Sequence, residues 1–295
     1  MKRNSVGTTA GRPSLRFLLA FLTIPAVWLA AAEKPHDKTF DTTREPLIRV
    51  NNLRGRVLLR GWDKARVHVV YTVVSPRVEV DNEVLPESGP AERLRFETHL
   101  LDARLVSDEQ VTDFIFDVPA GASLEIHNRQ GSVVVEGMQA DASLQSVNGD
   151  ITVRDYSGHL SVHSISGNIE VMRAAGILEA STITGSLHFV SPATTSLHGS
   201  TTSGRITYEG DFSPRGEYVL SAYSGDVDIL CPPSASYELT AKTLRGKVSN
   251  SLVMNHRREA ATPMEGASSL LGTHNTGKAS LEITSFSGNI NIRPQ

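Results

Sequence analysis

Histidines are the first side chains of interest in this 295-residue chain, because the chain has ten of them and imidazole is a common zinc ligand. His127 and His163 recur at equivalent places of a repeat, but Gln145 occupies that place in the copy between them. Strands stacked about 4.8 Å apart would leave these histidines roughly 10 Å apart, too far to share one zinc ion. His159 beside Asp141 offers too few ligands. We therefore expect no metal site and no bound cofactor.

Paired carboxylates are the second candidate, since glycoside hydrolysis uses two of them. Asp226 and Asp228 alternate along one predicted strand, and Asp150 holds the place of Asp226 in an earlier copy. The copies between them carry asparagine, serine and arginine there, and aspartate commonly caps a chain corner. The sequence offers no aromatic sugar platform beside these acids. We expect a protein that is not an enzyme, and a polysaccharide lyase or hydrolase is the alternative.

A stripe of hydroxyl and amide side chains is the third candidate. These residues lie three positions and one position before a recurring glycine. Stacked hydroxyls can present a weakly polar strip to a glycan or an envelope protein, or they can bond one another and the corner backbone. The candidate interaction stripe comprises Ser146, Asn148, Ser164, Ser166, Thr182, Thr184, Thr201 and Ser203.

All three groups belong to a repeat that runs from Leu124 to Ile229 in steps of 18, 18, 18, 19 and 21 residues. Its frame also recurs around Gly55, Gly246 and Gly288. The anchoring glycines are Gly131, Gly149, Gly167, Gly185, Gly204 and Gly225. Apolar residues alternate on both sides of each glycine, which predicts two short strands per copy.

Equivalent apolar residues, such as Ile151, Ile169 and Leu187, should stack through the core when copy lies on copy. An apolar column two residues before the glycine, with Ile165 and Tyr223 among its members, breaks the alternation. We expect the chain to turn a corner there. The predicted fold is an all-β parallel β-solenoid with coils of 18–21 residues. Tight antiparallel hairpins at the Asn-Gly and Ser-Gly pairs are the competing geometry.

The chain divides into several predicted segments. Residues 1–32 resemble a secretory signal, with Lys2 and Arg3 ahead of an apolar run from Phe17 to Ala30 and small residues at its end. Residues 33–45 form a polar leader and residues 46–295 the β-solenoid domain. Within that domain, residues 64–118 are irregular longer strands that form an atypical N-terminal cap, and residues 254–278 are a surface loop insertion.

The signal predicts an extracytoplasmic location: periplasmic, secreted or on the cell surface. Its apolar run is shorter than the roughly 20 residues that span a bilayer, so no transmembrane segment is expected after cleavage. A net charge of −3 gives no reason to expect a nucleic-acid partner. The single cysteine, Cys231, cannot form an internal disulfide and is expected in the core.

The stretch FDVPAGASLEIHNRQGSVVVEG, followed by Ser-Gly-(Asp/Asn)-Ile-x-Val units, resembles the exported bacterial putative-adhesin family. The matching positions are Val118 to Gly121 and the glycine series, although Arg205 and Lys247 depart from the pattern. This resemblance covers residues 46–292 and implies an extracytoplasmic β-solenoid without catalytic residues. We expect a non-catalytic cell-envelope module for adhesion or structure. A periplasmic partner of an envelope sensing system is a further alternative, and the oligomeric state is left open.

Overall fold

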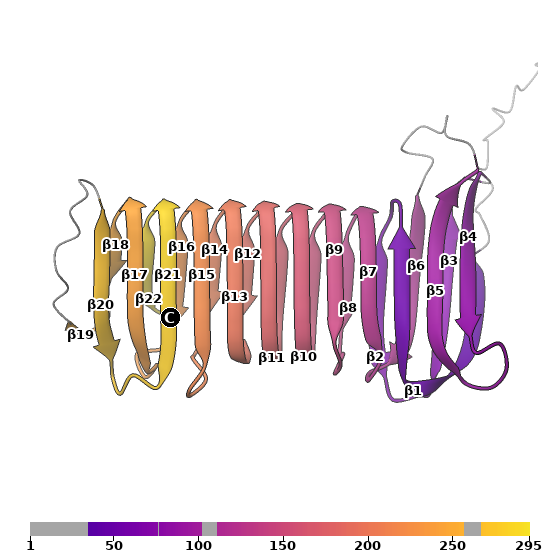
Figure 1. Cartoon of the computed structure of the whole chain (residues 1–295), viewed down its shortest axis with the longest axis horizontal. Coiled ribbons are helices and arrows are strands. Elements are labelled where there is room, and N and C mark those ends of the chain that lie inside the picture. Colours follow the sequence, from indigo (N-terminus) through magenta and orange to yellow (C-terminus); the bar gives the residue numbers. More distant parts are fainter. Residues whose placement is uncertain (1–34, 76, 102–110, 257–266) are drawn as a thin grey trace, which may run out of the picture. The chain divides into compact units, whose positions relative to one another are not determined.

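The computed structural model describes residues 35–75, 77–101, 111–256 and 267–295. The predicted signal, residues 1–32, lies outside the described residues. Every regular element within the described ranges is a β-strand, so the all-β prediction is confirmed. The strands belong to one mixed sheet that folds into two layers (Figure 1). Within the described ranges, no helix has the length and hydropathy needed to cross a membrane.

Each copy of the repeat places one strand in a front layer and one in a back layer (Figure 1). The front strands are β7 (Ser123–Gln130), β9 (Ala142–Asn148), β13 (Ala193–Ser203), β15 (Glu217–Ser224), β17 (Tyr237–Arg245) and β21 (Ala279–Ser287). The back strands are β2 (Val57–Trp62), β8 (Val133–Glu136), β12 (Leu187–Val190), β14 (Ile206–Glu209), β16 (Val227–Cys231), β18 (Val248–Asn250) and β22 (Ile290–Pro294). Two longer strands, β10 (Ile151–Ser166) and β11 (Ile169–Thr184), continue from the back layer into the front layer.

Successive copies pair in parallel and in register, as the repeat predicts. Ile151 pairs with Ile169, and Ile169 pairs with Leu187, and all three side chains are fully buried. Alternation puts every second side chain between the layers, where the aliphatic columns form the core. The competing hairpin geometry is wrong for the repeat, because its strands pair between copies and not within them.

The order of the stack departs from the order of the sequence at the C-terminal end. Strand β21 pairs with β15 on one side and with β17 on the other, and β22 likewise lies between β16 and β18. The last copy therefore inserts between two earlier ones, and Figure 1 shows β21 between β15 and β17.

The N-terminal end is partly as predicted. Strand β1 (His36–Asn52) includes most of the predicted polar leader, because residues 36–41 pair antiparallel with β3 (Arg66–Val73). Strand β4 (Val78–Leu85) pairs antiparallel with β5 (Ala91–Leu100). However, β5 pairs in parallel with β1, and β6 (Thr112–Pro119) pairs in parallel with β2. These two strands therefore extend both layers of the stack by one strand each.

The C-terminal end is also covered by antiparallel strands. Residues 254–278 contain β19 (Asn255–His256) and β20 (Ser268–His274), and β20 pairs antiparallel with β17. The prediction of a surface loop is wrong for these two stretches. The alternation in SSLLGTH is weak, but the unpaired edge of β17 gives its backbone hydrogen-bonding partners.

The glycines of the repeat stand at one corner of each copy, where neighbouring backbones approach closely. A Cβ at Gly149 would lie 2.1 Å from the carbonyl oxygen of Gly131, and one at Gly167 would lie 2.2 Å from that of Gly149. Gly149 also has a φ of 152°, whereas Gly167 has no left-handed φ. Close approach is therefore the requirement that these positions share, and backbone conformation adds to it at some of them.

Candidate functional site

The structure divides the predicted hydroxyl stripe into a buried and an exposed half. Ser146, Ser164, Thr182 and Thr201 face the core and are about 4–5% exposed. Three of them donate hydrogen bonds to corner carbonyl oxygens: Ser146 to Gly149 at 3.1 Å, Thr182 to Gly167 at 3.2 Å and Thr201 to Gly185 at 3.1 Å. These three hydrogen bonds stabilise the corner, and burial leaves this half of the predicted stripe little surface to offer a partner.

The other half, Asn148, Ser166, Thr184 and Ser203, is exposed at the front edge of the same corner. Each of these residues directly follows a member of the apolar column for which a chain corner was expected. That column is not at a corner, because each front strand continues straight through it and directs it outward. Its side chains are accordingly exposed: Val147 by 45%, Ile165 by 50%, Ile183 by 51% and Tyr223 by 58%.

We call this column the apolar ridge. It consists of the residues two positions before each corner glycine, and in stack order it comprises Leu53, Arg129, Val147, Ile165, Ile183, Thr202, Tyr223, Phe286 and Leu244. Arg129 and Thr202 interrupt the ridge, so its unbroken aliphatic part runs from Val147 to Ile183. Isolated surface hydrophobics need no explanation, but a row of neighbouring ones on a repeat protein typically marks an interaction surface.

A groove of about 510 Å³ runs beside the N-terminal half of the ridge. Val147, Ile165 and Ile183 line it together with His127 and His163, whose side chains project from the front layer. Nδ1 and Nε2 of His163 lie 2.5 and 3.0 Å from the hydroxyls of Ser181 and Ser161. The groove thus combines an apolar side with hydrogen-bonding groups.

A second hollow, of about 390 Å³, lies on the same face where the ridge becomes aromatic. The rings of Tyr223 and Phe286 are stacked, with centroids 4.8 Å apart and planes 4° from parallel. Tyr223 is exposed and Phe286 is half-buried, and sequence reasoning missed this pair. The alternation of the strand would have found it, since the ridge has the same parity as the outward-facing residues before it.

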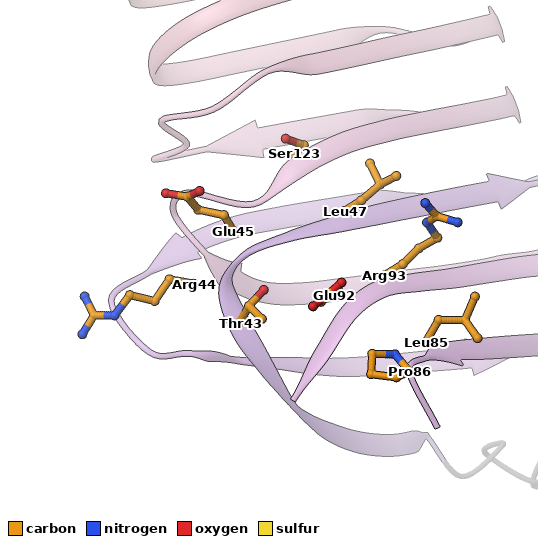
Figure 2. Close-up of a pocket in the computed structure, with 9 residues that line it drawn as sticks. All are labelled: Thr43, Arg44, Glu45, Leu47, Leu85, Pro86, Glu92, Arg93 and Ser123. Atoms are coloured by element: carbon orange, nitrogen blue, oxygen red, sulfur yellow. The ribbon is translucent and has the colours of Figure 1, made fainter. Parts of the chain in front are cut away.

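A third hollow, of about 890 Å³, lies at the N-terminal end between β1 and the turn that joins β4 to β5 (Figure 2). Two arginines and two glutamates line it, and all four are exposed. In Figure 2 the side chain of Arg44 points away from the other labelled side chains. Its charged groups do not converge on one point, so it is a weaker candidate than the front face.

The carboxylates considered above as candidates for acid catalysis have other partners. Within the described residues, no group of three His, Cys, Asp or Glu side chains is placed to hold a metal. The Asp150 carboxylate accepts a hydrogen bond from the backbone N–H of Asn168 at 2.8 Å. Asp228 is 6% exposed and lies between Arg205 and Arg293, at 3.5 and 3.2 Å. Corner capping and ion pairing therefore account for these carboxylates.

Cys231 is buried in the core as predicted, and burial raises the pKa of its thiol to about 11. A thiol that stays protonated at neutral pH is a poor nucleophile. Burial also raises the pKa of the Tyr156, Tyr208 and Tyr237 hydroxyls well above their usual range. These shifts result from packing in the core, and none of them belongs to the front-face groove.

No protein-family model matches the chain, and no curated protein matches it in sequence. Among solved structures it is similar to a putative adhesin from Bacteroides fragilis, with 10% identity, a TM-score of 0.47, and coverage of 88% of this chain and 97% of that one. A putative adhesin from Parabacteroides distasonis shows 11% identity, a TM-score of 0.41, and coverage of 88% and 98%. A putative cell adhesion protein from Clostridium sporogenes shows 12% identity, a TM-score of 0.29, and coverage of 89% and 100%. Similarities at this level transfer no residue roles to this chain.

Proposed function

We propose that the chain is a non-catalytic β-solenoid of the adhesion type that binds a surface carbohydrate chain along its front face. The observation that carries this proposal is the apolar ridge beside a hydrogen-bonding groove, repeated from copy to copy. In the proposed solenoid each copy is one coil. It consists of a back strand, a corner, a front strand and a second corner that carries the glycine. The extracytoplasmic location is proposed from the signal-like pattern of residues 1–32.

The repeating geometry supports a polymeric ligand. Equivalent groups recur along the stack at the strand spacing of about 4.8 Å, which is close to the length of one sugar ring. From Val147 to Ile183, each coil can therefore offer one aliphatic side chain and one or two polar groups to a sugar unit. Weak contacts repeated along an extended ligand add up to useful affinity.

The side chains also suit a carbohydrate in kind. Between Val147 and Ile183 the ridge is aliphatic, and the neighbouring outward column offers Gln145, His163 and Ser181. A pyranose ring has an apolar C–H face and a rim of hydroxyls. The aliphatic side chains can pack against the C–H face, and the polar side chains can form hydrogen bonds with the hydroxyls. Imidazole, amide and hydroxyl groups both donate and accept hydrogen bonds, as sugar hydroxyls do.

The test is a binding panel of immobilised polysaccharides, with neutral glucans and mannans and with acidic uronate polymers, against the purified protein. The double variant Ile165→Lys and Ile183→Lys should weaken binding by roughly tenfold or more, because both residues line the groove. The matched control is Thr152→Lys with Thr207→Lys, which adds the same charges to the outer side of the back layer.

Failure of the wild-type protein to bind any polysaccharide would overturn the proposal. An equal loss of binding in the two double variants would also overturn it, since the loss would then follow charge and not the front face.

A further inference from the structure

We propose that the hollow beside Tyr223 and Phe286 is a subsite for one uncharged sugar ring, which anchors the carbohydrate chain. This inference rests on the proposed function and locates its strongest contact. We call the site the aromatic hollow; the lining residues that bear on the argument are Ser200, Thr202, Ser221, Tyr223, Thr284 and Phe286.

The platform of the site is the free face of the Tyr223 ring. Phe286 stacks on one face, because β15 and β21 pair with Ser224 opposite Ser287. On the other side the ridge position is occupied by Thr202, whose side chain is short. The second face of Tyr223 is therefore open toward the hollow, and the residue is 58% exposed.

An aromatic face of this kind suits the C–H face of a pyranose. The ring carries a negative quadrupole on its face, which attracts weakly positive C–H groups, and its apolar surface gains from leaving water. Phe286 holds the platform rigid from behind, and the Arg245 guanidinium carbon lies 5.5 Å from the centre of the Phe286 ring. The pair is thus preorganised, so little side-chain entropy is lost when a ligand binds.

Hydroxyl groups line the floor of the hollow. Ser200 and Ser221 are exposed, and Thr284 donates a hydrogen bond to Ser221 at 3.0 Å. The remaining donor and acceptor positions of these hydroxyls are available to a ligand, and hydroxyls match the mixed donor and acceptor character of a sugar rim. An aliphatic peptide side chain would leave them without partners, which favours the sugar.

The charge of the lining selects among sugars. None of the residues that line the hollow is charged, and Arg245, which lies over the Phe286 ring, is not among them. A uronate or phosphate group placed there would lose hydration without gaining a counter-charge, which is unfavourable. The ring that fits is therefore neutral, such as a hexose.

The experiment measures affinity for a soluble neutral glucan or mannan by titration calorimetry, using whichever polymer the wild-type protein binds. Tyr223→Ala should weaken binding by roughly tenfold or more, while Tyr223→Phe, which keeps the ring, should stay within about threefold of wild type. The matched control is Ile115→Ala on β6, which truncates another exposed hydrophobic residue. The wild-type affinity should be the same at low and high salt, since no ion pair forms.

Wild-type affinity in Tyr223→Ala would overturn the subsite. If Ile165→Lys with Ile183→Lys still lost binding, the front-face function would stand without it. A preference for uronate polymers, or a marked loss of affinity with added salt, would overturn the choice of an uncharged sugar. A wild-type protein that bound no polysaccharide would remove the proposed function itself, and the subsite with it.

Discussion

Replacement of Gly167 by alanine tests the close packing of the corner ladder. The added Cβ would lie 2.2 Å from the Gly149 carbonyl oxygen, and a carbon normally stays about 3.3 Å or more from such an oxygen. The two backbones would have to separate by about 1 Å. Both are held by ladder hydrogen bonds, from Gly167 N to Thr184 O at 3.1 Å and from Gly149 N to Ser166 O at 3.0 Å.

The expected cost combines overpacking, of about 1–3 kcal/mol, with one or two weakened hydrogen bonds of about 1 kcal/mol each. Gly167→Ala should therefore lower the free energy of unfolding by about 3 kcal/mol, or Tm by roughly 6–12 °C. Backbone conformation contributes nothing at Gly167, because its φ is not left-handed. Gly149→Ala should cost more, since its φ of 152° adds strain to the same contact.

Gly89 is the matched control, with a φ of 89° and no atom within 4 Å of an added Cβ. Gly89→Ala should cost only about 1–2 kcal/mol, from backbone strain alone. The assay is urea and thermal unfolding followed by circular dichroism. If Gly167→Ala proved no more destabilising than Gly89→Ala, close approach of neighbouring backbones would not be the reason for glycine at this corner.

Three further predictions concern the core, the corner and the buried thiol. Ile169→Ala should lower the free energy of unfolding by about 2–5 kcal/mol, because Ile169 is fully buried. Ile165→Ala should lower it by less than about 1 kcal/mol, because Ile165 is half exposed. Equal costs in urea unfolding would contradict the assignment of these residues to the inner and outer faces. Thr182→Val should cost about 1–2 kcal/mol in the same assay, because the buried Gly167 carbonyl loses its donor. Thr184→Val removes only a solvent-exposed hydrogen bond to the Ile165 carbonyl, so it should change stability by less than about 0.5 kcal/mol. Burial raises the pKa of the Cys231 thiol from 9.0 to about 11. Between pH 9 and 11 the folded thiol therefore keeps its proton while the unfolded thiol loses it. The free energy of unfolding should fall over this range by up to about 1.4 kcal/mol per pH unit. Unfolding of Cys231→Ala should show a shallower fall over that range, and an unchanged slope would assign the effect to other groups.

The core was predictable from sequence because alternation and repetition agree there. Ile151, Ile169 and Leu187 are apolar, equivalent in the repeat and flanked by polar residues, so their stacking follows from the pattern. The position of the ridge does not follow from hydrophobicity, because its apolar residues stand at the alternate positions that face outward. Ile165 and Tyr223 are apolar, yet the strand does not bend before them, and parity alone puts them outside.

Two features could not be read from the pattern. The second corner of each copy lacks a constant residue: Asp155 and Arg173 adopt left-handed φ values of 51° there and pair through two hydrogen bonds of 2.6 and 2.8 Å. The order of the last copies is also hidden, because the columns around Gly246 and Gly288 fit either neighbour equally well. The subsite at Tyr223 depends on that order, since Phe286 comes beside it only through the insertion of β21.

The insertion of β21 and β22 also bears on how the protein matures. Strands β17 and β18 emerge from the ribosome before the pair that will connect them to β15 and β16. Until residue 294 has been synthesised, the strands that belong between β15 and β17 and between β16 and β18 are incomplete. Pairing between strands far apart in the sequence is slow. Completion of the stack thus depends on the synthesis of β21 and β22, and a chain truncated before β21 would leave unpaired edges on β15, β16, β17 and β18.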